Sequence, residues 1–243
     1  MKSTAVLACA LMCAALTHGA LALQTANTLD ADTLYRHRET LANAKQAANL
    51  WAARASVDYD AAWKLARVYY WIGNHESSKN QRANFERGVT AGETAVRLGS
   101  NRPEGHFWMA ANMGRLAESF GVLQGVKYRG RIKDELEKVL AIDPGWQGGS
   151  ADDALGQWYA SVPRLFGGSP QKAEQHLRSA IGHDPNNTSA LLFLGEMVMN
   201  QGRTAEARVY LQRVIDAQVD EDWVPEDREF KQKAASLLKT SQR

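Results

Sequence analysis

The chain has 243 residues, of which 29 are basic and 27 acidic, so its formal net charge is only +2. Basic and acidic side chains alternate along the sequence, as they do over 131–138, and they form no long block of one sign. This balance argues against a nucleic-acid partner and calls for no anionic membrane.

Residues 1–22 have the pattern of a secretory signal peptide. Lys2 gives a positive start, an apolar run over 5–16 is too short to span a bilayer, and Ala20-Leu21-Ala22 is a cleavage sequence of small residues. Cleavage after Ala22 removes Cys9 and Cys13, the only two cysteines, and leaves a single domain over 23–243. Met12 is bulky where a lipoprotein signal needs a small residue, which argues against lipidation. We therefore expect an exported, periplasmic protein, with no transmembrane segment after the signal.

Helical patterns follow one another along the rest of the chain, with almost no strand signal. Apolar residues recur at three- and four-residue intervals, as Leu41, Ala44, Ala48 and Trp51 do in the first segment. Aspartates are available as N-caps before the first two helices, and Ser169-Pro170 is a further helix start. The expected helices cover 30 or 32 to about 55, 58 or 60 to 73, and then 84–98, 105–120, 129–142, 151–162, 170–181, 188–200, 204–217 and 226–238.

Three segments between these helices are longer than short turns require, namely 74–81, 120–128 and 163–169. We expect all three to lie at the same edge of the stacked helices. Insertions at one edge commonly build an interaction surface. They are equally well explained as tolerated lengthening of surface loops, because insertions there cost little free energy.

A repeat of fixed length organises the helices into hairpins. Pro103, Pro144 and Pro185 recur every 41 residues, and small and apolar residues recur in phase with them. The clearest unit, over 190–217, carries tetratricopeptide spacing at Leu194, Gly195, Gly202, Ala207, Leu211 and Val214. The sequence thus predicts an all-α, tetratricopeptide-like α-solenoid of about four helical hairpins with terminal helices.

Aromatic residues concentrate in the first helix of each expected hairpin. In right-handed stacks of such hairpins the first helices line the concave side, so this bias predicts an aromatic inner wall suited to an apolar or extended ligand. Ordinary packing between hairpins is the alternative for each residue taken singly. The residues are Trp63, Tyr69, Tyr70, Trp71, Phe107, Trp108, Trp158, Tyr159 and Phe193.

The sequence contains no recognisable catalytic motif. It lacks a Gly-x-Ser-x-Gly elbow, a phosphate-binding glycine loop and a histidine pair at metal-binding spacing. Asp152-Asp153 is a carboxylate pair, but acidic residues at a helix N-terminus need no catalytic role. We therefore expect a protein that is not an enzyme, with no cofactor and no metal site.

Several segments together resemble a known family. They are 108–118 with Asn112-x-Gly114-Arg115-x-x-Glu118, 132–144 ending in Ala-Ile-Asp-Pro, Gly148-Gly149 before Leu155-Gly156, and the tail Asp222-Trp223-Val-Pro225-Glu-Asp-Arg. The chain resembles, over about 58–238, the T-component (TatT) family associated with tripartite ATP-independent periplasmic (TRAP) transporters. A related pattern occurs in the regulator of microtubule dynamics proteins, and the export signal favours the bacterial family.

This resemblance implies a tetratricopeptide-like protein with a cleft for a small hydrophobic ligand. It also implies docking to a periplasmic solute-binding protein and assembly as a homotrimer. The ligand-binding residues would be Trp108, Asn112, Arg115, Glu118, Trp158 and Tyr159, with Asn112 and Arg115 holding a polar head. Arg115 and Glu118 are equally well explained as an internal polar clamp between hairpins. The alternative function is a generic tetratricopeptide scaffold that binds peptides or protein partners in the cell envelope.

Overall fold

The computed structural model describes residues 30–120 and 122–240. The predicted signal peptide lies outside these residues, and so does its cleavage site. Within the described part the chain is helical throughout and contains no strand. The elements are α1 (Ala31–Arg36), α2 (Leu41–Ala52), α3 (Tyr59–His75), α4 (Ser78–Leu98), α5 (Pro103–Ser119), α6 (Val122–Ile142), α7 (Trp146–Ser161), a 3-10 turn η1 (Arg164–Phe166), α8 (Pro170–His183), α9 (Thr188–Asn200), α10 (Thr204–Asp216) and α11 (Val224–Thr240).

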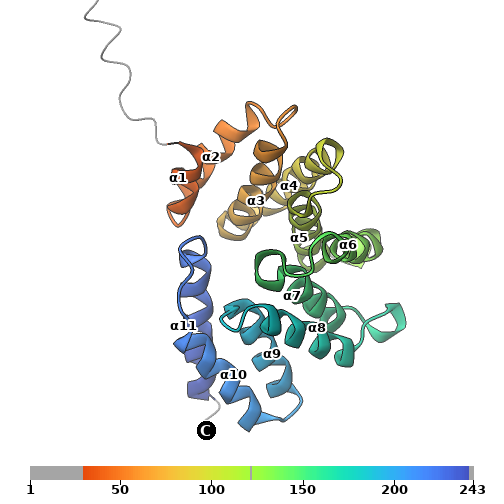
Figure 1. Cartoon of the computed structure of the whole chain (residues 1–243), viewed down its shortest axis with the longest axis vertical. Coiled ribbons are helices and arrows are strands. Elements are labelled where there is room, and N and C mark those ends of the chain that lie inside the picture. Colours follow the sequence, from red (N-terminus) through yellow and green to blue (C-terminus); the bar gives the residue numbers. More distant parts are fainter. Residues whose placement is uncertain (1–29, 121, 241–243) are drawn as a thin grey trace, which may run out of the picture.

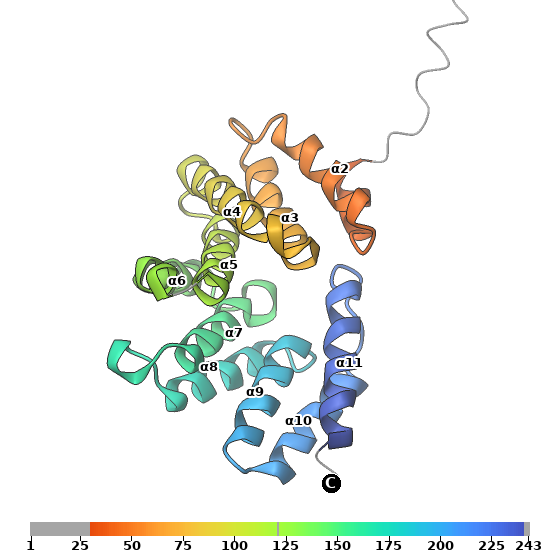
Figure 2. The same ribbon diagram turned by 180° about the vertical axis from the view of Figure 1, so that it is seen from behind.

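Four helical hairpins form the body of the molecule, as the repeat predicts. They pair α3 with α4, α5 with α6, α7 with α8 and α9 with α10. The first helices form an inner layer and the second helices an outer layer, and the stack curls until α11 lies next to the N-terminal helices (Figures 1 and 2). None of the helices in the described ranges combines the length and apolar character needed to cross a membrane.

The outer and inner layers approach closely where glycines replace side chains. Gly88 and Gly92 lie one turn apart on the face of α4 that packs against α5. A Cβ atom at Gly88 would lie 2.1 Å from Oδ1 of Asn112, and one at Gly92 would lie 2.8 Å from the Cα atom of Met109. Neither position has space for a methyl group, so the register of these two helices depends on the glycines.

Replacing Gly88 with alanine should lower the free energy of unfolding by about 1–3 kcal/mol, because the methyl group overpacks a buried contact. Gly130 is the matched control, since it is a glycine of α6 whose added Cβ would meet no atom within 4 Å. Gly130→Ala should instead be neutral or stabilise by about 0.5–1 kcal/mol through helix propensity. Urea denaturation of both variants measures the difference, and equal effects would contradict the close approach.

The N-terminal segment differs from the single helix expected up to residue 55. It forms two helices, α1 and α2, separated by a turn over 37–40. The turn frees the backbone carbonyl of Arg38 to accept a hydrogen bond from the Trp71 indole at 2.7 Å, while the Arg38 side chain is buried. The helix is therefore interrupted at 37–40, where the chain makes a tertiary contact with α3.

The prediction of three long loops at one edge is wrong for two of the three segments. Helix α4 begins at Ser78, and α6 already begins at Val122, so most of 74–81 and 120–128 is helical. Polar residues and single glycines weakened the helical pattern there, yet buried side chains such as Phe85 and Tyr128 hold these turns in place. Only 163–169 remains a true loop of extra length, built around η1.

Candidate functional site

The predicted ligand-binding residues divide between two helices. Trp108, Asn112, Arg115 and Glu118 lie on α5, and Trp158 and Tyr159 lie on α7. Asn112 is fully buried, and its amide donates hydrogen bonds to the backbone carbonyls of Ala66 on α3 (3.0 Å) and Trp108 (2.7 Å). Asn112 therefore joins α5 to α3 and faces Gly88 of α4.

Arg115 and Glu118 form an ion pair at 2.7 Å, in which both side chains are at least one-third exposed. The pair lies within one helix, so it is not a clamp between hairpins. The Arg115 guanidinium also lies 5.9 Å from the centre of the Phe85 ring. An exposed pair of this kind contributes little to stability, and both charges remain accessible to a partner.

The two residues on α7 have structural partners of their own. The Trp158 indole donates to the Arg129 carbonyl of α6 at 3.0 Å, and the Tyr159 ring stacks on His176 of α8 at 5.3 Å. In the described part of the chain no hydrogen bond or ring contact joins them to Trp108, Asn112, Arg115 or Glu118. The ligand-binding role of these six residues stays a prediction.

Aromatic residues of the inner helices are largely covered by other parts of the same chain. Trp108 is only 3% exposed, because Trp223 stacks on it at 6.2 Å and Tyr70 packs beside it at 5.8 Å. Phe107 contacts Trp146 at 5.0 Å. For these rings, ordinary packing explains the aromatic bias of the first helices.

The terminal helices cover the two ends of the inner layer. At one end, the Arg67 guanidinium of α3 lies 4.0 Å from the ring of Tyr35 on α1. At the other end, Lys233 of α11 pairs with Glu196 of α9 at 2.7 Å and lies over the Phe193 ring. The concave side is therefore occupied at both ends by α1 and α11.

A buried contact joins the two ends of the chain, and we call it the terminal clasp: Arg38, Asp222, Trp223 and Glu226. Arg38 is 1% exposed and donates to both carboxylate oxygens of Glu226, to the Asp222 carbonyl at 2.7 Å and to the Tyr35 carbonyl at 3.1 Å. Burial raises the pKa of Glu226, and the Arg38 charge opposes that rise. Sequence patterns gave no signal for this clasp, because Arg38 and Glu226 are 188 positions apart.

The inner layer has open space at Gly114, in the C-terminal half of α5. Helical spacing puts Ala111, Gly114 and Glu118 on the same face as Phe107, opposite the buried residues that pack against the outer helices. A Cβ at Gly114 would meet no atom within 4 Å, so space is open there. We call Ala111, Gly114, Arg115 and Glu118 the α5 strip.

The adjacent carboxylates Asp152 and Asp153 point to different helices. Asp152 accepts hydrogen bonds from His176 and Ser179 of α8, both at 2.6 Å, and these contacts lower its pKa against the effect of burial. Asp153 accepts from Ser189 of α9 at 2.6 Å, and burial raises its pKa to about 6. The two residues tie α7 to the next two helices and do not form a shared carboxylate site.

Replacing Asp153 with asparagine should stabilise the protein at pH 8 by up to about 3 kcal/mol, the amount that corresponds to a pKa raised from 3.8 to about 6. The penalty of ionising Asp153 appears as pH rises above 3.8 and is complete above about 6, so the gain should vanish in acid. Asp152→Asn is the control and should destabilise at pH 8, because the pKa of Asp152 is lowered. Thermal unfolding across pH measures both, and the same sign for the two variants would contradict the assignment.

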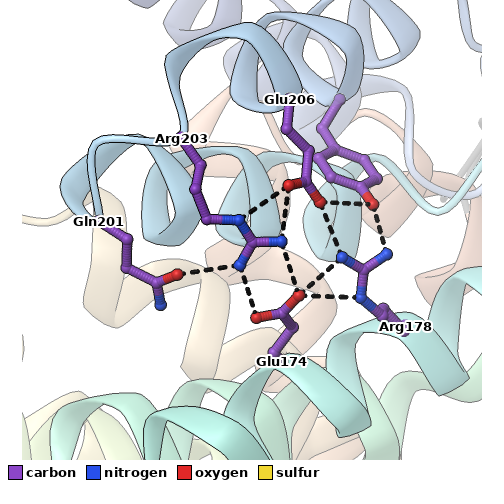
Figure 3. Close-up of polar contacts among 6 residues, drawn as sticks. Glu174, Arg178, Gln201, Arg203 and Glu206 are labelled. Atoms are coloured by element: carbon purple, nitrogen blue, oxygen red, sulfur yellow. Dashed lines mark hydrogen bonds and ion pairs between the residues drawn. The ribbon is translucent and has the colours of Figure 1, made fainter.

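The outer surface between α8 and α10 carries a closed network of charges (Figure 3). Glu174 pairs with Arg203 at 2.8 Å and with Arg178 at 2.6 Å, and these arginines lower its pKa to about 2. Glu206 completes the network with both arginines. Each charge is matched inside the network, so this surface offers little net charge to a partner. Elsewhere in the described ranges, no group of three or more His, Cys, Asp or Glu residues is arranged to hold a metal ion.

Comparison with solved structures shows the fold. A thermophilic TPR protein of Thermus thermophilus matches with a TM-score of 0.64 and 18% identity, covering 86% of this chain and 97% of the other. The predicted all-α, tetratricopeptide-like solenoid is confirmed.

Comparison with protein families corrects the resemblance to the TRAP-transporter T-component family, which is wrong. The model of the family described as regulator of microtubule dynamics protein 1-3 matches residues 27–242. The residues that carried the resemblance do not separate the two families, because a related pattern occurs in both; one of them, Asn112, serves helix packing. The solute-binding partner and the homotrimer followed from that resemblance alone and remain untested.

Two curated relatives are regulator of microtubule dynamics protein 3 of Rattus norvegicus and of Mus musculus. Each is 24% identical over 107 residues, which is 44% of this chain and 22% of the relative. The match thus spans about a fifth of the length of either relative, whereas the family model matches nearly the whole of this chain. The chain therefore belongs to the family of regulator of microtubule dynamics protein 1-3.

Proposed function

We propose that this chain is a non-catalytic scaffold that binds a protein or peptide partner across the α5 strip. The observation that carries the proposal is the open space at Gly114 on the inner helix α5, between the two ends that α1 and α11 occupy. Stacks of helical hairpins present their inner helices as an extended binding surface. Here α1 and α11 occupy its ends, so the α5 strip is the place for a partner.

The chemistry of the α5 strip suits an extended segment of polypeptide. Ala111 has a small side chain and Gly114 has none, which permits close approach of another backbone. Arg115 and Glu118 are accessible at its edge and offer one charge of each sign. A partner could exchange their exposed ion pair for contacts of its own at little cost in free energy.

A photo-crosslinking amino acid at position 114 tests this proposal in the cell of origin. The crosslinked partner would be identified by mass spectrometry and purified. Titration would then compare its affinity for the unmodified chain with its affinity for the Gly114→Trp variant. We expect the bulky ring to fill the open space and to weaken binding by at least about tenfold, as the loss of a central interface contact does.

Position 130 is the matched control, because Gly130 also has open space around its Cβ position but lies on the outer helix α6. A crosslinker there should capture a different set of proteins or none, and Gly130→Trp should bind the purified partner normally. The proposal fails if positions 114 and 130 capture the same proteins, or if Gly114→Trp binds as tightly as the unmodified chain.

A small apolar ligand with a polar group is the second candidate, and one observation favours it. Trp108 Nε1 and Arg115 Nε are buried and have no hydrogen-bond partner in the described residues. Buried donors are usually satisfied, so both are available to an acceptor atom of a ligand. Native mass spectrometry of the gently purified protein tests this, because a specific adduct should disappear in Arg115→Leu while a peptide partner would leave no small adduct.

A further inference from the structure

The loop between α7 and α8 exposes two large apolar side chains at its tip. Leu165 is 88% exposed and Phe166 is 48% exposed, and both belong to η1. Figure 1 shows this connection projecting from the outer side of the stack, away from α11. Placing such side chains in water is unfavourable, which raises the question of what they contact.

The loop has a defined shape. The amides of Phe166 and Gly168 both donate to the Pro163 carbonyl, at 2.8 and 3.2 Å, and Gly167 has a φ of +103° that closes the turn. The Ser169 amide donates to the Tyr159 carbonyl at 2.9 Å. The exposure of Leu165 and Phe166 is thus built into the backbone.

Two side chains support the loop, one from α6 of the preceding hairpin and one from α7. The Arg129 guanidinium lies 4.7 Å from the centre of the Phe166 ring. The Trp158 ring lies under Gly167, where an added Cβ would be 3.6 Å from it, and its indole donates to the Arg129 carbonyl. These contacts place α6 and the loop side by side.

The surroundings of the loop are basic. The sequence has no acidic residue between Glu118 and Asp134 or between Asp153 and Glu174, and these are the two segments that meet at the loop. In the structure, Arg131 and Lys133 pair with Glu93 and Glu137. The remaining cations of these segments form no ion pair with an acid of the described chain: Lys127, Arg129, Arg164 and Lys172.

We propose that this loop docks the protein on an anionic lipid surface, which the near-zero net charge of the whole chain does not call for but the local group of unpaired cations does. Leu165 and Phe166 enter the headgroup region, while Arg129, Arg164 and Lys172 contact the negatively charged headgroups. Apolar side chains with basic residues beside them bind such surfaces because the apolar groups are buried in the interface and the basic groups are attracted to anionic lipids. A protein partner fits less well, because two side chains on a convex tip fall far short of the area of a stable protein interface.

Flotation of the purified full-length chain with lipid vesicles tests the proposal. We expect binding to vesicles of equal parts phosphatidylcholine and phosphatidylglycerol, weakened by salt, and at least about tenfold weaker binding to phosphatidylcholine alone. Leu165→Ser combined with Phe166→Ser should lower the partition coefficient at least about tenfold, since it removes the apolar anchor. Arg164→Gln combined with Lys172→Gln should weaken binding only to the anionic vesicles.

Matched controls change exposed residues of the same kind elsewhere on the surface. Val57→Ser with Val209→Ser removes two apolar side chains that are 80% and 59% exposed, and Arg208→Gln with Arg228→Gln removes two exposed cations. Both controls should bind like the unmodified chain. Mass spectrometry should verify that all proteins share one N-terminus, so that any contribution from residues 1–22 is common to them.

Hydrogen exchange gives a local readout that does not depend on the N-terminus. Anionic vesicles should slow exchange in the peptide over 163–168 and leave the α10 surface unchanged. The proposal is overturned if this peptide is not protected, if the loop variants float like the controls, or if a crosslinker at position 165 captures a protein in cells while vesicles do not bind.

Discussion

Replacing Arg38 with alanine is expected to lower the free energy of unfolding by about 3–5 kcal/mol, the usual effect of breaking a buried ion pair. Arg38 fills its site with a guanidinium that satisfies Glu226 and two backbone carbonyls. Its removal leaves the Glu226 carboxylate, 17% exposed, without its partner. Chemical denaturation measures the loss.

The same variant should also loosen the contact between the two ends of the chain. Because the terminal clasp holds the start of α11 against α1, hydrogen exchange over 222–229 should become faster in Arg38→Ala even under native conditions. Arg54→Ala is the control, since Arg54 forms an exposed ion pair with Asp58, and it should change stability by no more than about 1 kcal/mol. If both variants lose the same stability, the clasp is not a significant contact.

A double-mutant cycle separates the pair from other effects of truncation. The double variant Arg38→Ala with Glu226→Ala should lose about 1–3 kcal/mol less free energy of unfolding than the sum of the two single variants. Each single change leaves the other charged group without its partner. Strict additivity would show that Arg38 acts through its packing against Tyr35 and Trp71, which lie 4.5 and 5.2 Å from its guanidinium, and not through Glu226.

Replacing His106 with glutamine should cost about 3 kcal/mol at pH 6, because it breaks a second buried ion pair. His106 is 2% exposed, with Nδ1 at 2.5 Å from Glu135 and Nε2 at 2.9 Å from the Ser100 carbonyl. Both ring nitrogens face acceptors, so the ring is held as a charged imidazolium. The pair joins α5 to α6 and to the turn before α5.

The contribution of this pair should depend on pH in a defined direction. The Glu135 hydrogen bond raises the pKa of His106 above 6.5, so the contribution of His106 is complete below pH 6.5 and is lost as pH rises through its folded-state pKa. His106 and Lys138 lower the pKa of Glu135 against the effect of burial, so the contribution of Glu135 is present above pH 4.5 and is lost in stronger acid.

The stability difference between the unmodified protein and His106→Gln should therefore be widest between pH 4.5 and 6.5 and should narrow on either side. Denaturation curves across this range measure it. His37→Gln is the matched control, since His37 is largely exposed and its change should leave the pH profile intact. A difference that grows from neutral pH into the alkaline range would contradict the charged pair.

Local patterns predicted the helices and hairpins well for physical reasons. Helical spacing, N-caps and the 41-residue interval all reflect interactions within one or two turns or between neighbouring helices, and the structure has the corresponding four hairpins. The predictions failed where tertiary contacts override local preference, as at the turn of Arg38 and in the polar first turns of α4 and the glycine-containing start of α6.

The candidate site was less predictable than the fold. The family resemblance singled out Asn112 and Trp108 as ligand-binding residues, and the structure gives both of them partners within the chain. Gly114 was noticed only as part of a motif. The open space beside Gly114 depends on how the surrounding helices pack, which the motif does not encode.

The stack of helical hairpins follows from the amino-acid sequence without further information, because periodicity and small residues at helix contacts act locally. Two other features exist only once the chain has folded: Arg38 meets Glu226 across 188 positions, and the basic segments of α6 and the 163–169 loop form one surface. The first depends on the curvature of the stack, whereas the second depends on the packing of two successive hairpins. That curvature is the sum of small rotations between successive hairpins, and no single segment of the sequence specifies it.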